Sequence, residues 1–334
     1  MYGTYDKKNL NLIIFMILWE HTDEDHRLQQ QEIVQLVKTE YGIEIDRRSV
    51  KNNVEALKNI FFDTDYEIST DKGYCLLGRE FTDAELRMLI DSVLFSKDIS
   101  QKQAKELIKK IKSLSNKYFS AKVAHVCNLP DLQHADKKQQ VLYNLDVIDD
   151  AIDKGKKISF IYNKYDTNFK LVPKRAGYTY VVTPYQMVAH NGHYYLICNF
   201  DKYSELAHLR VDKMTEVKIL NEMAKSKKEI PEWDNGFRLS KYLSEHIYMY
   251  GGKSVGTIIK CQDTLMDELV DWFGKDFRVL SNNDGEITIR VVANEQAMFY
   301  WALQYGSCAE IIEPLDLREK IEDAVGKMAR VYGK

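Results

Sequence analysis

Aromatic and cationic side chains are concentrated in one stretch of the chain, residues 181–220. Its apolar residues alternate or run together as they do in short β-strands, and Asn191-Gly192 is a strong signal for a two-residue hairpin turn. Aromatic rings with cationic groups between them suit a flat, anionic ligand such as a nucleotide or a single nucleic-acid strand. The side chains of this kind are Tyr185, Tyr194, Tyr195, His208, Arg210 and Lys213.

Strand geometry divides these residues between two faces, because successive side chains point in opposite directions. Tyr194 and Tyr195 therefore cannot both enter one pocket, and one of them is expected in the core. His208 and Arg210 share a face, which makes Arg210 the strongest candidate contact for an anion. The alternative is a salt bridge from Arg210 to Asp212 or Glu216. The expected ligand contacts are then Tyr162, Tyr185, Tyr194, His208, Arg210 and Lys213.

A second candidate site lies on a helix that is predicted to begin after Asp46, a residue type preferred at N-caps. The first turns of this helix carry polar side chains that can contact phosphates and base edges, namely Arg47, Arg48, Ser49, Lys51 and Asn52. Such residues near the N-terminal end of a recognition helix are placed to enter the major groove of DNA. The sequence therefore predicts a DNA contact here.

Two earlier helices and a following hairpin would position this helix. Apolar spacing predicts helices over about 7–20 and from Leu28 to Gly42. Strands 66–69 and 74–77 flank a turn, so a wing is expected, with Lys72 near a phosphate. The alternative is a helical trio that never touches DNA, since the first 80 residues hold ten Lys/Arg against fifteen Asp/Glu.

Composition and charge place limits on the function. A chain of 334 residues, 45% hydrophobic and 29% charged, is expected to form two or three globular domains. The net charge of −3 argues against a protein that coats nucleic acid through bulk charge, although residues 150–220 carry a local +4. Five widely separated cysteines indicate reduced thiols, and residues 10–19 are too short to span a bilayer. A cytoplasmic protein is expected.

Motifs for catalysis are missing from the sequence. There is no G-x-S-x-G, no glycine loop that would cradle a phosphate and no H-E-x-x-H. His190 and His193 bracket the Asn191-Gly192 turn, but no cysteine or carboxylate stands at metal-ligand spacing, so both are expected to be exposed turn histidines. We therefore expect no catalytic residues, no metal and no cofactor.

The rest of the chain is predicted to contain further helices and strands. Capping boxes at Thr82 and Ser100 open helices through about Phe95 and about Tyr118, and residues 123–138 have the composition of a linker. The last part has the order βαββαβ with a closing helix over 315–331. We expect an α+β multidomain chain with these divisions: a winged helix-turn-helix over 1–80, a helical linker over 81–140, a ligand-sensing β unit over 141–222, a connector over 223–252 and a ferredoxin-like α/β extension over 253–334.

Several short motifs resemble those of the WYL domain, which is named for a Trp-Tyr-Leu triplet. Tyr194-Tyr195-Leu196 resembles the triplet, with a tyrosine in place of the tryptophan. The supporting segments are FIY at 160–162, TPY at 183–185 and HLRVDKM at 208–214. The segment YGSCAEIIEPLDLREKI at 305–321 resembles the family's C-terminal extension. Lys213 stands where an arginine is usual, and lysine supplies charge without bidentate geometry.

The resemblance implies a bacterial transcriptional regulator, generally dimeric, whose WYL domain is an Sm-like β-barrel that senses a ligand. In some members that ligand is single-stranded nucleic acid or a nucleotide. We therefore expect a homodimeric repressor that binds a double-stranded DNA operator and responds to an anionic nucleotide or single-stranded effector. The alternatives are an accessory nucleic-acid-binding module of an RNA or phage-defence system, which does not control transcription, and an enzyme acting on nucleotides.

Overall fold

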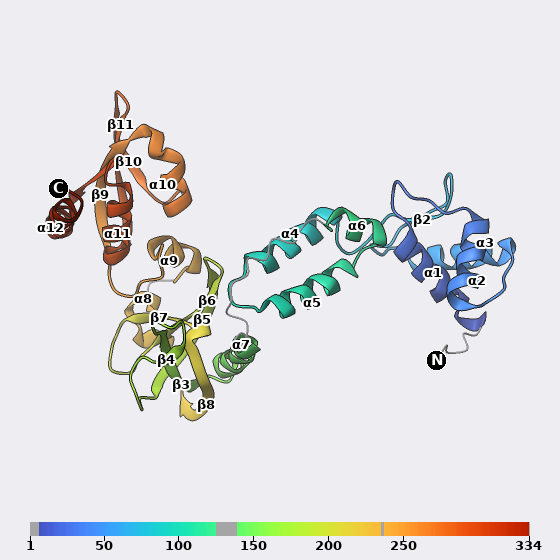
Figure 1. Ribbon diagram of the computed structural model, residues 1–334, viewed down its shortest axis with the longest axis horizontal. Coiled ribbons are helices and arrows are strands. Elements are labelled where there is room, and N and C mark those ends of the chain that lie inside the picture. Colours follow the sequence, from blue (N-terminus) through green and yellow to red (C-terminus); the bar gives the residue numbers. More distant parts are fainter. Residues whose placement is uncertain (1–6, 125–138, 235–236, 334) are drawn as a thin grey trace. The chain divides into compact units, whose positions relative to one another are not determined.

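The computed structural model describes residues 7–124, 139–234 and 237–333, and the chain divides into two compact units, 1–136 and 137–334 (Figure 1). Helices and strands are mixed, as predicted, and the first unit is largely helical. In the described part of the chain, no helix is long and apolar enough to cross a membrane. Most of the predicted linker over 123–138 lies outside the described residues.

Three helices form the core of the first unit after a short 3₁₀ turn, Lys7–Asn9: α1 (Leu10–His21), α2 (Gln30–Tyr41) and α3 (Arg47–Ile60). Their buried residues have the predicted helical spacing and include Ile14, Ile33, Val50 and Val54. The prediction that Leu28 belongs to the second helix is wrong. Leu28 forms a β-bridge with Tyr74, with both N–H···O bonds between 2.8 and 3.0 Å, and so extends the hairpin sheet.

The hairpin and three further helices complete the first unit. The strands β1 (Ile68–Ser69) and β2 (Cys75–Leu76) are shorter than predicted. The capping boxes at Thr82 and Ser100 are confirmed and open α4 (Asp83–Phe95) and α5 (Gln101–Lys112). The predicted extension of α5 to Tyr118 is wrong, because Asn116 caps a new helix, α6 (Lys117–Lys122), by accepting from two backbone N–H groups at 2.9 Å.

A curled antiparallel sheet forms the first part of the second unit, after helix α7 (Gln139–Asp153). Its strands are β3 (Lys156–Tyr165), β4 (Leu171–Pro173), β5 (Tyr180–His190), β6 (His193–Asn199), β7 (Leu206–Arg210) and β8 (Met214–Met223). The strand order is β4-β3-β5-β6-β7, and β8 pairs with β3. Positive φ angles at Asn191 and Gly192 confirm the predicted hairpin turn, whereas β4 was not predicted. The inner face packs with α7 around Phe160, Leu196 and Val217.

Short helices occupy the predicted connector, where no regular structure was expected. They are a 3₁₀ turn (Lys227–Glu229), α8 (Pro231–Asp234) and α9 (Leu239–Glu245), and they lie beside strands β5 to β7 (Figure 1). Ile230, Tyr242 and Met249 from this segment form one buried cluster with Tyr185 and Ile197 of the sheet. The outer face of the sheet is therefore covered by the connector.

The last part of the chain follows the predicted order of elements closely. These elements are β9 (Ser254–Gln262), α10 (Met266–Phe273), β10 (Arg278–Asn283), β11 (Glu286–Asn294), α11 (Glu295–Tyr305), β12 (Ala309–Glu313) and α12 (Leu315–Tyr332). All neighbouring strands are antiparallel, in the order β10-β11-β9-β12. The helices pack on one core with the sheet, in which Trp301 and Phe273 are fully buried.

Candidate DNA-recognition helix and effector site

The predicted recognition helix is α3, and its start is fixed by Asp46. The Asp46 carboxylate accepts a hydrogen bond from the Ser49 backbone N–H at 2.7 Å, which lowers the pKa of Asp46. This is the N-cap arrangement that the sequence predicts. The side chains of Arg48, Lys51 and Asn52 are exposed on the surface of the helix.

Two of the predicted contacts have local roles as well. The Arg47 Nε donates to Oε1 of Gln31 on α2 at 2.9 Å, so its guanidinium group is directed towards the neighbouring helix. Ser49 is only partly exposed, and its carbonyl accepts from the Asn53 side chain at 2.7 Å. The exposed donors that remain at the N-terminal end of α3 are Arg48, Lys51 and Asn52.

The wing turn is held by two residues that sequence reasoning missed. Arg27 donates through Nη1 to the Ser69 hydroxyl at 3.1 Å and to the Asp71 carbonyl at 2.8 Å, and Gln29 donates to the Lys72 carbonyl at 3.2 Å. Lys72 itself is exposed and has a φ of 53°. The bonds from Arg27 and Gln29 therefore hold the backbone of the turn, and the Lys72 ammonium group projects from it.

Gly73 lies in the wing turn, and Gly73→Ala is expected to destabilise the first unit by about 1–3 kcal/mol. Its φ is 127°, and an added Cβ would lie 3.0 Å from both Arg27 Cβ and Gln29 Nε2. Thermal unfolding measures the loss. Gly42→Ala is the matched control, because Gly42 also has a positive φ, 70°, but open space around its Cβ position. Equal losses in the two variants would show that crowding at the wing is not the cause.

The tyrosines of the sheet divide between its two faces, as the strand geometry predicts. Tyr162 and Tyr194 pack against the inner cluster with α7, and Tyr195 packs against the outer cluster with the connector. The Tyr162 hydroxyl accepts a hydrogen bond from the Arg210 backbone N–H at 3.2 Å, and burial raises the pKa of Tyr162 to about 12. This hydrogen bond holds the end of β7 from the inner face of the sheet.

Two predicted effector contacts lie under the connector. Tyr185 is only 4% exposed, its hydroxyl donates to the Lys225 carbonyl at 3.0 Å, and its ring lies 5.1 Å from that of Trp233. His208 Nε2 lies 2.7 Å from the Tyr242 hydroxyl, and burial lowers the pKa of His208 to about 4. His208 is therefore uncharged at neutral pH. With the connector in place, Tyr185 is buried and His208 is engaged by Tyr242.

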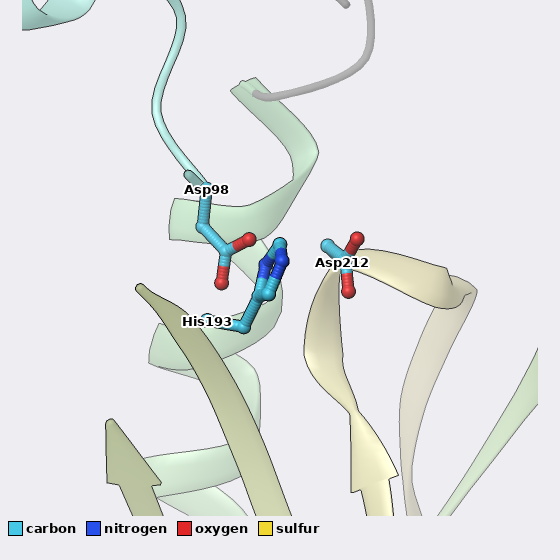
Figure 2. Close-up of side chains that lie close together, drawn as sticks. All are labelled: Asp98, His193 and Asp212. Carbon is cyan, nitrogen blue, oxygen red and sulfur yellow. The ribbon is translucent and has the colours of Figure 1, made fainter. Parts of the chain in front are cut away.

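Arg210 forms the salt bridge that the sequence offered as the alternative. Its Nε and Nη2 donate to the two carboxylate oxygens of Asp212 at 2.9 and 2.8 Å, and Nη2 lies 3.2 Å from Nδ1 of His193. His193 and Asp212, both labelled in Figure 2, face each other from the start of β6 and from the 3₁₀ turn Val211–Lys213. Arg210 is thus held in a fixed orientation by an acidic partner.

Lys213 and Lys174 add positive charge beside Arg210, and we call Lys174, Arg210 and Lys213 the basic corner. Partial burial and the charge of Arg210 lower the pKa of Lys213, and Lys174 contributes in the same direction. The backbone of this corner is pinned by a residue that sequence reasoning missed. Asn144 on α7 is fully buried and donates to the carbonyls of Val211 at 3.3 Å and Met214 at 2.9 Å.

The turn histidines are not exposed as predicted. His190 is partly buried, and its Nε2 donates to the Ile247 carbonyl at 2.9 Å, so it joins the sheet to the segment after α9. His193 is also partly buried, beside Arg210. Both positions follow from packing between distant segments, for which the local sequence contains no signal.

Comparison with known proteins identifies one domain. Residues 143–219 match the family model described as the WYL domain. Over 155 residues the chain is 24% identical to the uncharacterized HTH-type transcriptional regulator YobV of Bacillus subtilis (strain 168), and the matched segment covers 45% of each chain. This chain therefore matches less than half the length of that relative.

Two solved structures match this chain at low identity and with low TM-scores. The proteasome accessory factor B/C (PafBC) of Arthrobacter aurescens is 13% identical, with a TM-score of 0.29, and the match covers 97% of this chain and 49% of that one. A CRISPR Cas-related protein is 12% identical, with a TM-score of 0.39, and the match covers 99% and 88%. The domain assignment depends on the family match, which includes most of α7, most of the curled sheet and the basic corner. Residues 143–219 of this chain form a WYL domain.

Proposed function

We propose that this protein is a DNA-binding transcriptional regulator with a WYL sensor domain. The observation that supports this proposal most directly is α3, a capped helix with exposed Arg48, Lys51 and Asn52, followed by a hairpin whose turn carries the exposed Lys72. This is the arrangement of a winged helix-turn-helix, in which the helix enters the major groove and the wing contacts the phosphate backbone. The WYL domain and the weak similarity to an HTH-type regulator support the same function.

We also propose a role for the curled sheet, for the last part of the chain and for dimer formation. The curled sheet is an Sm-like barrel that binds an anionic nucleotide or single-stranded nucleic acid through the basic corner. The four-stranded sheet, in the order β10-β11-β9-β12, and the helices α10 and α11 that connect its strands form a ferredoxin-like extension. The protein acts as a homodimer and a repressor, and the effector changes the spacing of the two recognition helices, because a dimer fits two half-sites only at a fixed separation.

Arg48→Ala is expected to weaken operator binding by ~1–3 kcal/mol, or about five-fold to 150-fold. The exposed guanidinium of Arg48 can donate to a guanine edge or a phosphate, and alanine removes every donor. A gel shift at physiological salt against the gene's own upstream region measures the affinity.

Arg87→Ala provides a matched control for charge and side-chain size. Arg87 is a partly exposed arginine of α4 that pairs with Asp91 at 2.9 Å, outside the recognition helix. The Arg87→Ala substitution is expected to leave operator affinity nearly unchanged. Equal binding by the wild type and Arg48→Ala would contradict DNA recognition by α3.

A further inference from the structure

The segment from the start of β3 to the start of β5 carries an excess of positive charge, of which the basic corner includes only Lys174. Residues 156–180 contain six Lys/Arg and one acidic residue, Asp166. Lys170, Lys174 and Arg175 are exposed, and among the described residues none of them has an ion-pair partner. This charge is therefore available to an external anion.

Exposed aromatic rings stand among these cations. Phe169 is 77% exposed, Tyr178 47% and Tyr165 42%. The Arg175 guanidinium lies 5.5 Å from the centroid of the Tyr178 ring, which in turn packs edge-on against Tyr180 at 4.8 Å. Rings beside cations on an exposed sheet edge combine a stacking surface with phosphate contacts.

The turn between β3 and β4 holds Phe169 outward. The Asp166 carboxylate accepts from the backbone N–H groups of Asn168 at 2.9 Å and Lys170 at 2.8 Å, so the one acidic residue of the segment fixes the turn. Phe169 has a φ of 60°, in the left-handed region that non-glycine residues rarely adopt. The Phe169 ring is thus exposed to water, and a flat ligand that covered it would remove apolar surface from water.

We propose that this surface binds single-stranded nucleic acid, with bases stacked on Tyr165, Phe169 and Tyr178 and phosphates at Lys170, Lys174 and Arg175. We call these six residues the hairpin surface. A duplex does not fit this chemistry, because its bases are stacked on one another and cannot offer their faces to the rings. None of the six is among the residues that the WYL motifs indicate.

The length of the hairpin surface distinguishes an oligonucleotide from a mononucleotide. Phe160 pairs with Tyr180 in the antiparallel pair of β3 and β5, so Tyr178, two residues before Tyr180, lies near the level of Tyr162. Tyr165 is three residues farther along β3, or about 10 Å at a rise of ~3.3 Å per residue. One base cannot stack on both rings at this separation.

The hairpin surface is continuous with the basic corner. The Lys174 backbone N–H donates to the Tyr162 carbonyl at 2.8 Å, and the charge of Lys174 lowers the pKa of Lys213. A strand on the hairpin can thus continue to Arg210. The assignment of this strand as the effector rests on the proposed function, whereas the binding surface itself does not.

The test measures binding of fluorescently labelled oligonucleotides to the full chain by anisotropy. We expect the wild type to bind a 12-nucleotide dT strand more tightly than a 4-nucleotide strand or a 12-base-pair duplex. Phe169→Ala together with Tyr178→Ala is expected to weaken binding of the 12-nucleotide strand by about 100-fold, roughly tenfold per ring. Lys170→Ala together with Lys174→Ala is expected to reduce the slope of log K against log salt by about 1.4, since each phosphate contact on a single strand contributes about 0.7.

Two exposed residues from the last part of the chain provide matched controls. Tyr300→Ala removes an exposed ring, 44% accessible, and Lys275→Ala removes an exposed cation. Both are expected to leave the affinity unchanged. Equal weakening by Tyr300→Ala and the double ring variant, or no effect of removing the rings, would overturn the proposal. So would a wild type that binds the duplex as tightly as the single strand.

The outcomes also separate this inference from the proposed function. Arg48→Ala is expected to retain full affinity for the single strand, and the double ring variant is expected to retain full affinity for the operator. Single-strand binding without operator binding would support the hairpin surface and contradict the regulator, and would favour the accessory nucleic-acid-binding module. Operator binding without single-strand binding would contradict the hairpin surface alone.

Discussion

Acidification from pH 7 to pH 4.5 is expected to release the segment from α9 to Met249 from the outer face of the sheet before the rest of the second unit unfolds. Three histidines join this segment to the sheet. His208 lies 2.7 Å from the Tyr242 hydroxyl, His190 donates to the Ile247 carbonyl at 2.9 Å, and the His246 ring stacks on Tyr242 at 4.1 Å. All three are accommodated uncharged, because burial lowers the pKa of each.

The sign of the effect follows from the depressed pKa values. An unfolded histidine takes up a proton near pH 6.5, whereas His208 in the folded protein does so only near pH 4. Its contribution to stability is therefore complete above pH 6.5 and is lost as the pH falls from 6.5 towards 4. The shift corresponds to at most about 3 kcal/mol. Protonated His246 and His190 would repel a protonated His208. The carboxylates of Glu232 and Glu245 raise the pKa of His246, but they offset the effect of its burial only in part.

Hydrogen exchange measured peptide by peptide, and corrected for the intrinsic exchange rate at each pH, tests this prediction. Protection of residues 239–249 is expected to fall by up to about 100-fold between pH 7 and pH 4.5, while β9 and β11 stay protected. In His208→Gln the loss with falling pH should be smaller, because one titrating group has been removed. His26→Gln, at an exposed histidine of the first unit, should follow the wild type. Uniform loss of protection across the second unit would contradict the prediction.

Most elements of the fold were predictable because their signals are local. The Asn191-Gly192 turn fixed the β5–β6 register, Asp46 and the two capping boxes fixed helix starts, and alternation located the strands after Gly252. The connector helices were missed because α8 and α9 span only four and seven residues. Helices this short contain too few turns for a periodic apolar stripe.

The candidate effector site was predictable only in part, because its surroundings come from distant segments. Strand alternation correctly separated Tyr194 from Tyr195. Nothing near Tyr185 or His208 in sequence shows that connector residues such as Trp233 and Tyr242 pack against them. The Arg210–Asp212 pair was visible as an alternative because the two residues are close in sequence. Asn144, which holds the same turn from 67 residues away, carries no motif.

The buried Asn144 amide holds the turn at residues 211–214 through two backbone carbonyls. Asn144→Leu is expected to destabilise the second unit by roughly 2–4 kcal/mol, because it removes both donors that reach the carbonyls of Val211 and Met214 and leaves buried acceptors without a partner. These carbonyls flank the turn that carries Asp212 and Lys213. The expected local result is loss of hydrogen-exchange protection in residues 210–216, together with weaker binding of an anionic effector at the basic corner.

Asn199→Leu separates this local effect from a general loss of stability. Asn199 is equally buried and also donates to two backbone carbonyls, those of Tyr203 at 2.9 Å and Glu205 at 2.8 Å. Its replacement should cost a similar free energy of unfolding, measured by urea denaturation, but should open residues 200–206 and leave the turn at 211–213 protected. If both variants opened the same segment, or if Asn144→Leu left 210–216 protected, Asn144 would not be the residue that holds the basic corner in place.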